Sequence, residues 1–184
     1  SVSADRFTEQ IDALLDAGYH FVSPREALDT IEGNRPIPDK GVLIAFDDGC
    51  ESIFTLAEPV LTSRGIQALV FVTTDPEAFV FHLESNPQPR CSENQIQKLI
   101  EKGWIFGVHS ATHLPPGSMD VEDLKRDFAK STQWLHSITG SPITDYAVPG
   151  NFHSPILTEV AGQMGIERIW SASPGIITSQ SKPH

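Results

Sequence analysis

The sequence predicts an α/β fold built on a mainly parallel sheet, because short apolar strands alternate with amphipathic helices along the chain. The strands are continuous apolar runs such as GVLIAF at 41–46 and QALVFVTT at 67–74, which is typical of strands buried on both faces. No internal repeat or linker interrupts the alternation, and 184 residues suffice for one domain with a substantial core. We therefore expect residues 1–184 to form a single domain.

The helices are predicted from apolar positions that recur with helical spacing and from the residues at their ends. Ser23 and Glu26 form a capping box, Ser92 is a cap for a later helix, and Pro59 predicts a kink within another. In chain order, the predicted helices are 4–18, 23–33, 51–65, 92–103, 120–140 and 154–165. The predicted strands are 41–46, 67–74, 104–110, 143–149 and 167–173.

The net charge of the chain excludes some classes of binding partner. Thirteen basic residues against 24 acidic residues leave a formal net charge of -11, which repels phosphate backbones and anionic lipid headgroups. We therefore expect no nucleic-acid partner and a neutral or cationic substrate. No apolar run is long enough to predict a transmembrane segment, so we expect a soluble protein, either cytoplasmic or exported after removal of a signal peptide. Cys50 and Cys91 are predicted to be free thiols.

Polar side chains collect where the predicted strands end, which in parallel α/β folds is where ligands bind. Asp47, Asp48 and Gly49 follow the strand 41–46, and His109 and His113 follow the strand that begins at 104. The spacing of the two histidines suits a zinc ion, and Asp48 would supply a third ligand. The cation would relieve the repulsion between the two carboxylates and leave Asp47 to take a proton. Gly49 lets the backbone turn sharply.

These residues resemble a known family. FDDG at 46–49, HSATH at 109–113 and the later Pro149–Gly150 are similar to motifs of the polysaccharide deacetylases, the NodB-homology carbohydrate esterases of family four. The segments 5–23, 58–75 and 165–175 resemble the subgroup that includes poly-N-acetylglucosamine deacetylases. The resemblance implies a distorted (β/α) barrel, a divalent metal that is commonly zinc, and removal of N-acetyl groups from amino-sugar polymers. It makes residues 1–184 a single catalytic domain, and both ends of the chain suggest a truncated copy.

The resemblance also assigns roles to residues. Asp47 matches the general base, while Asp48, His109 and His113 match the metal ligands. Ser110 and Thr112 match small hydroxyl residues that brace the histidine loop. Pro149 precedes the backbone at Gly150 or Asn151, where an N–H group would face the oxyanion.

The sequence departs from the family pattern in two places. Many members carry an arginine that orients the base, and Ala147 or Tyr146 stands near that position here. The acid histidine of the family has no clear counterpart, with His153 and His184 as weak candidates and His20, His82 and His136 as surface or cap residues. Two alternatives therefore stay open beside the deacetylase: a related C–N hydrolase that acts on a small or lipid-linked amide, and an inactive barrel that binds carbohydrate.

Overall fold

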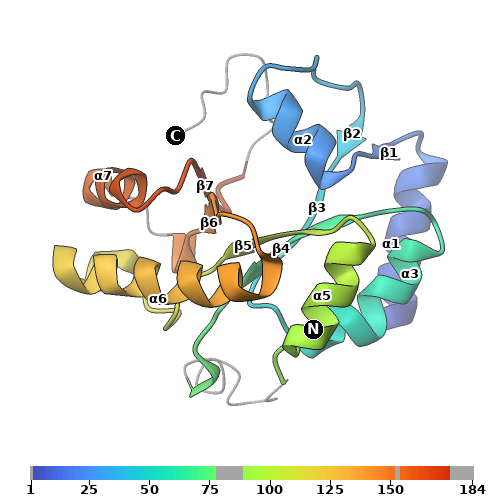
Figure 1. Cartoon of the computed structure of the whole chain (residues 1–184). Coiled ribbons are helices and arrows are strands. Elements are labelled where there is room, and N and C mark those ends of the chain that lie inside the picture. Colours follow the sequence, from blue (N-terminus) through green and yellow to red (C-terminus); the bar gives the residue numbers. More distant parts are fainter. Residues whose placement is uncertain (1, 78–88, 152–153, 175–184) are drawn as a thin grey trace.

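The computed structural model describes residues 2–77, 89–151 and 154–174, and its elements follow the predicted alternation (Figure 1). The strands are β1 (His20–Phe21), β2 (Gly41–Val42), β3 (Ile44–Phe46), β4 (Ala68–Val72), β5 (Ile105–Val108), β6 (Asp145–Ala147) and β7 (Arg168–Trp170). The α-helices are α1 (Ala4–Asp16), α2 (Pro24–Ile31), α3 (Glu58–Thr62), α5 (Glu93–Glu101), α6 (Val121–Thr139) and α7 (Pro155–Gln163). The π-helical turn η1 (Ile53–Ala57) precedes α3, and the 3-10 turns η2 (Pro116–Ser118) and η3 (Pro149–Asn151) follow β5 and β6.

Five strands form a parallel sheet in the order β3-β4-β5-β6-β7, so each strand lies beside its neighbour in the sequence. The sheet curls into a half-barrel with helices around it (Figure 1). This arrangement confirms the predicted α/β fold, a distorted (β/α) barrel of mainly parallel strands. Because the strands are parallel, their carboxyl ends share one rim of the half-barrel.

Two details of the strands differ from the prediction. The strand β1 pairs with β2 in parallel and was not predicted, because two residues are too short to show a period. Hydrogen bonds on either side lengthen the pairing, with the His20 amide donating to Lys40 O at 3.1 Å and the Val22 amide to Val42 O at 2.9 Å. The predicted strand 41–46 is divided at Leu43 into β2 and β3.

Local hydrogen bonds begin the helices as the sequence predicts. Ser23 and Glu26 form the predicted capping box of α2, and Ser92 caps α5 together with Gln95. The Asp120 side chain accepts a hydrogen bond from the amide of Asp123 at 2.8 Å and caps α6. Among the described residues, no helix combines the length and the apolar character needed to cross a membrane.

Pro59 distorts its helix in a specific way. The segment 53–62 begins as the π-helical turn η1, in which the amide of Glu58 bonds back to Ile53 O, and continues as α3 with Pro59 in its first turn. Proline has no amide hydrogen, so it fits a helix start better than a helix interior. The predicted kink is therefore a change of helix type at Pro59.

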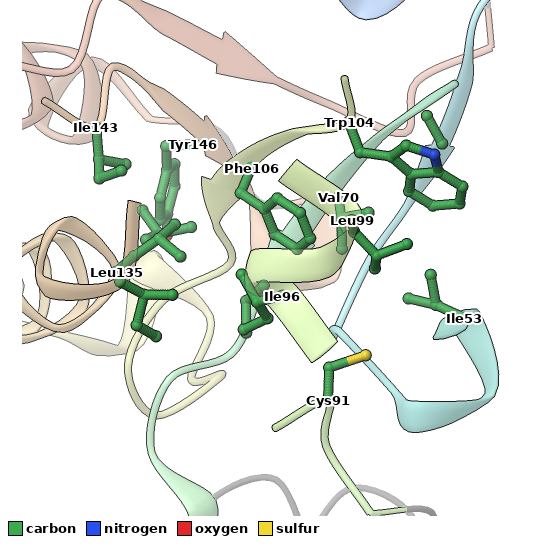
Figure 2. Packing of buried hydrophobic residues seen from close by; sticks show 14 of the residues in the cluster. Ile53, Val70, Cys91, Ile96, Leu99, Trp104, Phe106, Leu135, Ile143 and Tyr146 are labelled. Atoms are coloured by element: carbon green, nitrogen blue, oxygen red, sulfur yellow. The ribbon is translucent and has the colours of Figure 1, made fainter. Parts of the chain in front are cut away.

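The hydrophobic core covers both faces of the sheet, because side chains alternate along each strand. The larger cluster lies between the sheet and the helices. Figure 2 shows part of it: Val70, Phe106 and Tyr146 from the strands, with Ile96, Leu99 and Leu135 from α5 and α6. On the other face Leu69, Phe71 and Ala147 form a smaller cluster, against which Trp170 packs. The ring centroids of Phe71 and Trp170 are 5.8 Å apart.

Candidate metal centre at the rim of the half-barrel

The predicted site residues follow the carboxyl ends of three strands of the same parallel sheet, β3, β5 and β6. Asp47 and Asp48 come directly after β3, and His109 comes directly after β5. The turn η3, which contains Gly150, comes after β6. Since these strands belong to one parallel sheet, the fold brings the residues to the same rim.

The backbone after β3 makes a tight turn that only glycine accommodates at its second position. Asp48 and Gly49 have positive φ values of 66° and 78°. The Gly49 amide donates to Asp47 O at 2.8 Å, and the Thr73 amide donates to Asp48 O at 3.1 Å. A Cβ atom at Gly49 would lie 2.9 Å from Cγ1 of Val72. The turn after β3 therefore leaves no room for a side chain at the position that follows Asp47 and Asp48.

Asp48, His109 and His113 form the one group of potential metal ligands found in the described part of the chain, with ligand atoms within 4.8 Å of one another. Asp48 Oδ1 lies 3.2 Å from Nε2 of His113 and 3.7 Å from Nε2 of His109. The His109 side chain is 5% exposed, whereas the Asp48 side chain is 35% exposed. The group is thus anchored in the protein on one side and open to ligands on the other.

His109 is oriented by a backbone carbonyl. Its Nδ1 lies 3.0 Å from Ala147 O, and because a carbonyl oxygen only accepts, Nδ1 carries the hydrogen. Nε2 then has its lone pair directed at the Asp48 side. Burial lowers the pKa of His109, although the neighbouring Asp47 carboxylate opposes this effect. A neutral imidazole held in this way is the form that binds a metal ion.

Asp47 lies at the open edge of the same group. Desolvation raises the pKa of the Asp47 carboxyl; the His109 imidazole opposes this, and the Asp48 charge adds to it. No hydrogen bond to the Asp47 carboxylate is formed within the described residues. The charged or titratable groups that act on the Asp47 carboxyl are therefore the three potential ligands.

The histidine loop depends on a residue that the sequence analysis missed. Asp127 of α6 is 6% exposed and accepts hydrogen bonds from Ser110, Ala111 and Thr112. Ser110 and Thr112 were predicted to brace the loop, but their partner was not identified. The signal in the sequence is a carboxylate on the apolar face of a helix, one turn after Leu124.

Polar groups of the turn η3 form hydrogen bonds with other parts of the protein. Pro149 is buried, and Gly150 and Asn151 have positive φ values of 65° and 58°. The Asn151 amide donates to Val148 O at 3.1 Å. The Asn151 side chain accepts from the amide of Ala172 at 2.8 Å. Asn151 therefore holds the segment after β7.

The two residues near the position of the family arginine, Tyr146 and Ala147, lie on opposite faces of β6. Tyr146 packs toward α6, with its ring centroid 4.7 Å from that of Phe128. Ala147 lies on the opposite face and contributes its carbonyl oxygen to His109. The correspondence of either residue to the arginine stays a prediction.

The remaining histidines do not join the site in the described residues. His136 is in the last turn of α6, and its Nδ1 lies 2.9 Å from Ser141 O, as expected of a cap residue. His20 is exposed on β1. The candidates His153 and His184, and His82, lie outside the described residues.

The fold matches that of solved NodB-type deacetylase structures. The sequence model of the polysaccharide deacetylase family matches residues 34–169, and the chain belongs to this family. It is 23% identical over 174 residues to the putative polysaccharide deacetylase YxkH of Bacillus subtilis, which covers 95% of this chain and 60% of that protein. A segment of 61 residues is 36% identical to the poly-beta-1,6-N-acetyl-D-glucosamine N-deacetylase of Escherichia coli, covering 33% of this chain and 9% of that protein.

Solved structures extend the comparison to the fold. IcaB from Ammonifex degensii superimposes with a TM-score of 0.80 at 27% identity, over 93% of this chain and 76% of that chain. The predicted resemblance to the poly-N-acetylglucosamine deacetylases is thereby confirmed. The chain spans 60% of the length of YxkH, and its description as a single catalytic domain stays a prediction.

Proposed function

We propose that the chain is a metal-dependent hydrolase that removes N-acetyl groups from an amino-sugar polysaccharide or oligosaccharide. The observation that carries the proposal is the grouping of Asp48, His109 and His113, next to the Asp47 carboxylate. Hydrolysis of an acetamide is accelerated by a Lewis acid at the carbonyl and by a base for the attacking water. Residues for both tasks meet at this rim.

The three side chains fit a divalent ion, and we propose Zn²⁺. Two imidazole nitrogens and one carboxylate oxygen are a ligand set that leaves a position for substrate. The Nδ1 hydrogen bond of His109 to Ala147 O supports this proposal, because it leaves Nε2 free to coordinate. A bound Zn²⁺ would supply Lewis-acid activation of the acetamide carbonyl and of the attacking water.

The neighbouring residues are proposed to handle the proton and the negative charge. Asp47 takes the proton of the attacking water, and desolvation, which raises the pKa of this carboxyl, makes it a stronger base. The Gly150 amide is the proposed donor to the oxyanion, because the Asn151 amide already bonds to Val148 O. Pro149 and Gly49 shape the two turns that hold these groups.

The substrate class is proposed from charge and from the relatives. A net charge of -11 disfavours a polyanionic substrate, whereas deacetylation of N-acetylglucosamine units turns a neutral polymer into a cationic one. The E. coli relative is named for poly-beta-1,6-N-acetyl-D-glucosamine. We therefore propose a polymer or oligomer of N-acetylglucosamine.

Acetate release from N-acetylglucosamine oligomers by the zinc-loaded chain tests the proposal. Asp47→Asn should lower turnover by about 10²- to 10⁴-fold while zinc stays bound, because it removes only the base. His113→Ala should lose both zinc and activity. Asp39→Asn, the same chemical change at an exposed carboxylate, should leave both unchanged. Full turnover in Asp47→Asn would remove Asp47 as the base.

One observation favours a second candidate, an inactive barrel that binds carbohydrate. The Asp47 carboxylate has no hydrogen-bond partner among the described residues, whereas the resemblance implies an arginine that orients the base. Zinc binding without acetate release from any substrate would support this candidate. Acetate release from small amides, but not from glycans, would instead indicate the related C–N hydrolase.

A further inference from the structure

We propose that Asp127 of α6 is a positioning residue that holds the metal ligand His113 in place through the histidine loop. The inference rests on the proposed metal site and adds a residue that none of the predicted roles includes. It is argued from the hydrogen bonds of the loop 110–113, from its backbone conformation, and from the different support of His109.

The Asp127 carboxylate is buried and is bonded entirely to the histidine loop. Its Oδ2 accepts from the hydroxyl groups of Ser110 and Thr112, both at 3.0 Å, and from the Thr112 amide at 3.1 Å. Its Oδ1 accepts from the Ala111 amide at 3.0 Å. No ion pair to Asp127 is found among the described residues, so these donors compensate its charge.

Ser110 transmits this support to His113. Its hydroxyl donates to Asp127, which leaves the oxygen lone pairs to accept from the loop. They accept from the His113 amide at 3.0 Å and from the Thr112 amide at 3.2 Å. Two hydrogen bonds therefore connect the carboxylate on α6 with the backbone of His113.

The loop needs this support because two of its residues have a strained backbone. Ser110 and His113 have φ values of 70° and 57°, in the left-handed region that costs a residue with a side chain roughly 1 kcal/mol. The carbonyls of Ser110 and Ala111 are held by the amides of Thr74 and Asp75. The amides of residues 111–113 donate to the side chains of Asp127 and Ser110.

His109 is held independently of Asp127. Its amide donates to Val72 O at 2.9 Å, which continues the ladder between β4 and β5. Its ring bonds to Ala147 O. Loss of the Asp127 carboxylate should therefore displace His113 and leave His109 where it is.

Asp127→Asn is the sharpest variant, because each carboxylate oxygen faces a backbone amide. The Ala111 amide donates to Oδ1 at 3.0 Å and also to Oδ2 at 3.1 Å, and the Thr112 amide donates to Oδ2 at 3.1 Å. A carboxamide has only one acceptor oxygen, so either orientation sets its NH₂ group against an amide that cannot accept. Ser131→Ala is the matched control: Ser131 is fully buried one turn later on α6, and its hydroxyl bonds to the carbonyls of Asp127 and Phe128.

Two measurements on the whole chain test the inference. Zinc affinity, from competition with a chromophoric chelator, should fall about 10- to 100-fold in Asp127→Asn and stay unchanged in Ser131→Ala. In the metal-free protein, the imidazole NMR signals of His113 should shift or broaden in Asp127→Asn, while those of His109 stay in place. If Asp127→Asn does not fold, Ser110→Ala breaks the same connection and should change the His113 signals alone.

Unchanged zinc affinity and unchanged His113 signals in folded Asp127→Asn would overturn the inference. Equal changes at His109 and His113 would also overturn it, since they would indicate a general loss of structure. If the wild-type chain bound no zinc, the proposed function would fail, but the metal-free NMR comparison would still decide whether Asp127 positions His113.

Discussion

The buried pair of Asp145 and Arg168 offers a quantitative test of what holds the half-barrel together. Arg168 of β7 bonds to both carboxylate oxygens of Asp145 in β6, with Nε–Oδ1 at 2.7 Å and Nη2–Oδ2 at 2.8 Å. The Trp170 indole also donates to Oδ1 at 2.9 Å. The side chains of Asp145 and Arg168 are 4% and 12% exposed. Asp145→Ala would leave the guanidinium in this site without its main partner.

The loss of stability expected for Asp145→Ala follows from the burial of the Asp145–Arg168 pair. Removing one partner of a buried pair costs about 3–5 kcal/mol, because the other charge stays desolvated. Arg168 keeps other contacts, since its Nη1 lies 2.8 Å from Oε1 of Glu32 and 3.3 Å from Oε2 of Glu167, and its Nη2 donates to the Thr144 hydroxyl at 2.7 Å. These contacts offset part of the loss, so we expect the free energy of unfolding to fall by about 3 kcal/mol, at the lower end of that range.

Urea unfolding of the metal-free chain measures this change. The double variant Asp145→Ala/Arg168→Met should be more stable than Asp145→Ala alone, because it removes the uncompensated charge as well. Asp29→Ala, which breaks the exposed pair of Asp29 with Arg25, should cost less than about 1 kcal/mol. If Asp145→Ala cost no more than Asp29→Ala, or if the double variant were the least stable, the reasoning about burial would be refuted.

Two further predictions concern the thiols and the packing of the sheet. Burial raises the pKa of the Cys50 and Cys91 thiols to about 11 from 9.0, so at pH 8 about 100-fold less thiolate is present than in an unperturbed thiol. Alkylation by iodoacetamide should therefore be slow in the folded chain and accelerate as the pH rises toward 11; equal rates in folded and urea-unfolded protein would contradict this. Gly107→Ala should cost about 1–3 kcal/mol, because its Cβ would lie 2.6 Å from the backbone oxygen of Asp145. An unchanged melting temperature would show that β5 and β6 separate without cost.

Features that depend on neighbours in the chain were predictable. The capping box of Ser23 and Glu26 and the cap at Ser92 follow from hydrogen bonds that span three residues. The apolar run 68–72 is buried at every position, which is why a parallel sheet with two covered faces was the correct interpretation. Asp47 and His109 both follow strands, and the carboxyl ends of parallel strands lie at the same rim, so their proximity could be predicted as well.

Features that depend on distant segments were not predictable. β1 consists of two residues and exists through its pairing with β2, which the sequence does not signal. The sequence places Asp127 on the apolar face of its helix, but it does not show that the histidine loop supplies the hydrogen-bond donors to this carboxylate. The sequence also does not show which face of β6 carries Tyr146 and which carries Ala147, since a shift of one residue in register exchanges the two faces.

The sequence by itself determined the order of strands and helices and the chemical groups at the strand ends, because periodicity and capping act over a few residues. Only the tertiary structure decided which nitrogen of His109 faces Asp48 and which carboxylate supports His113. Those choices are made by hydrogen bonds to Ala147 and Asp127, which are 38 and 15 to 17 positions away from their partners. Contacts of that separation form only when the sheet has closed around its core and α6 has packed against it.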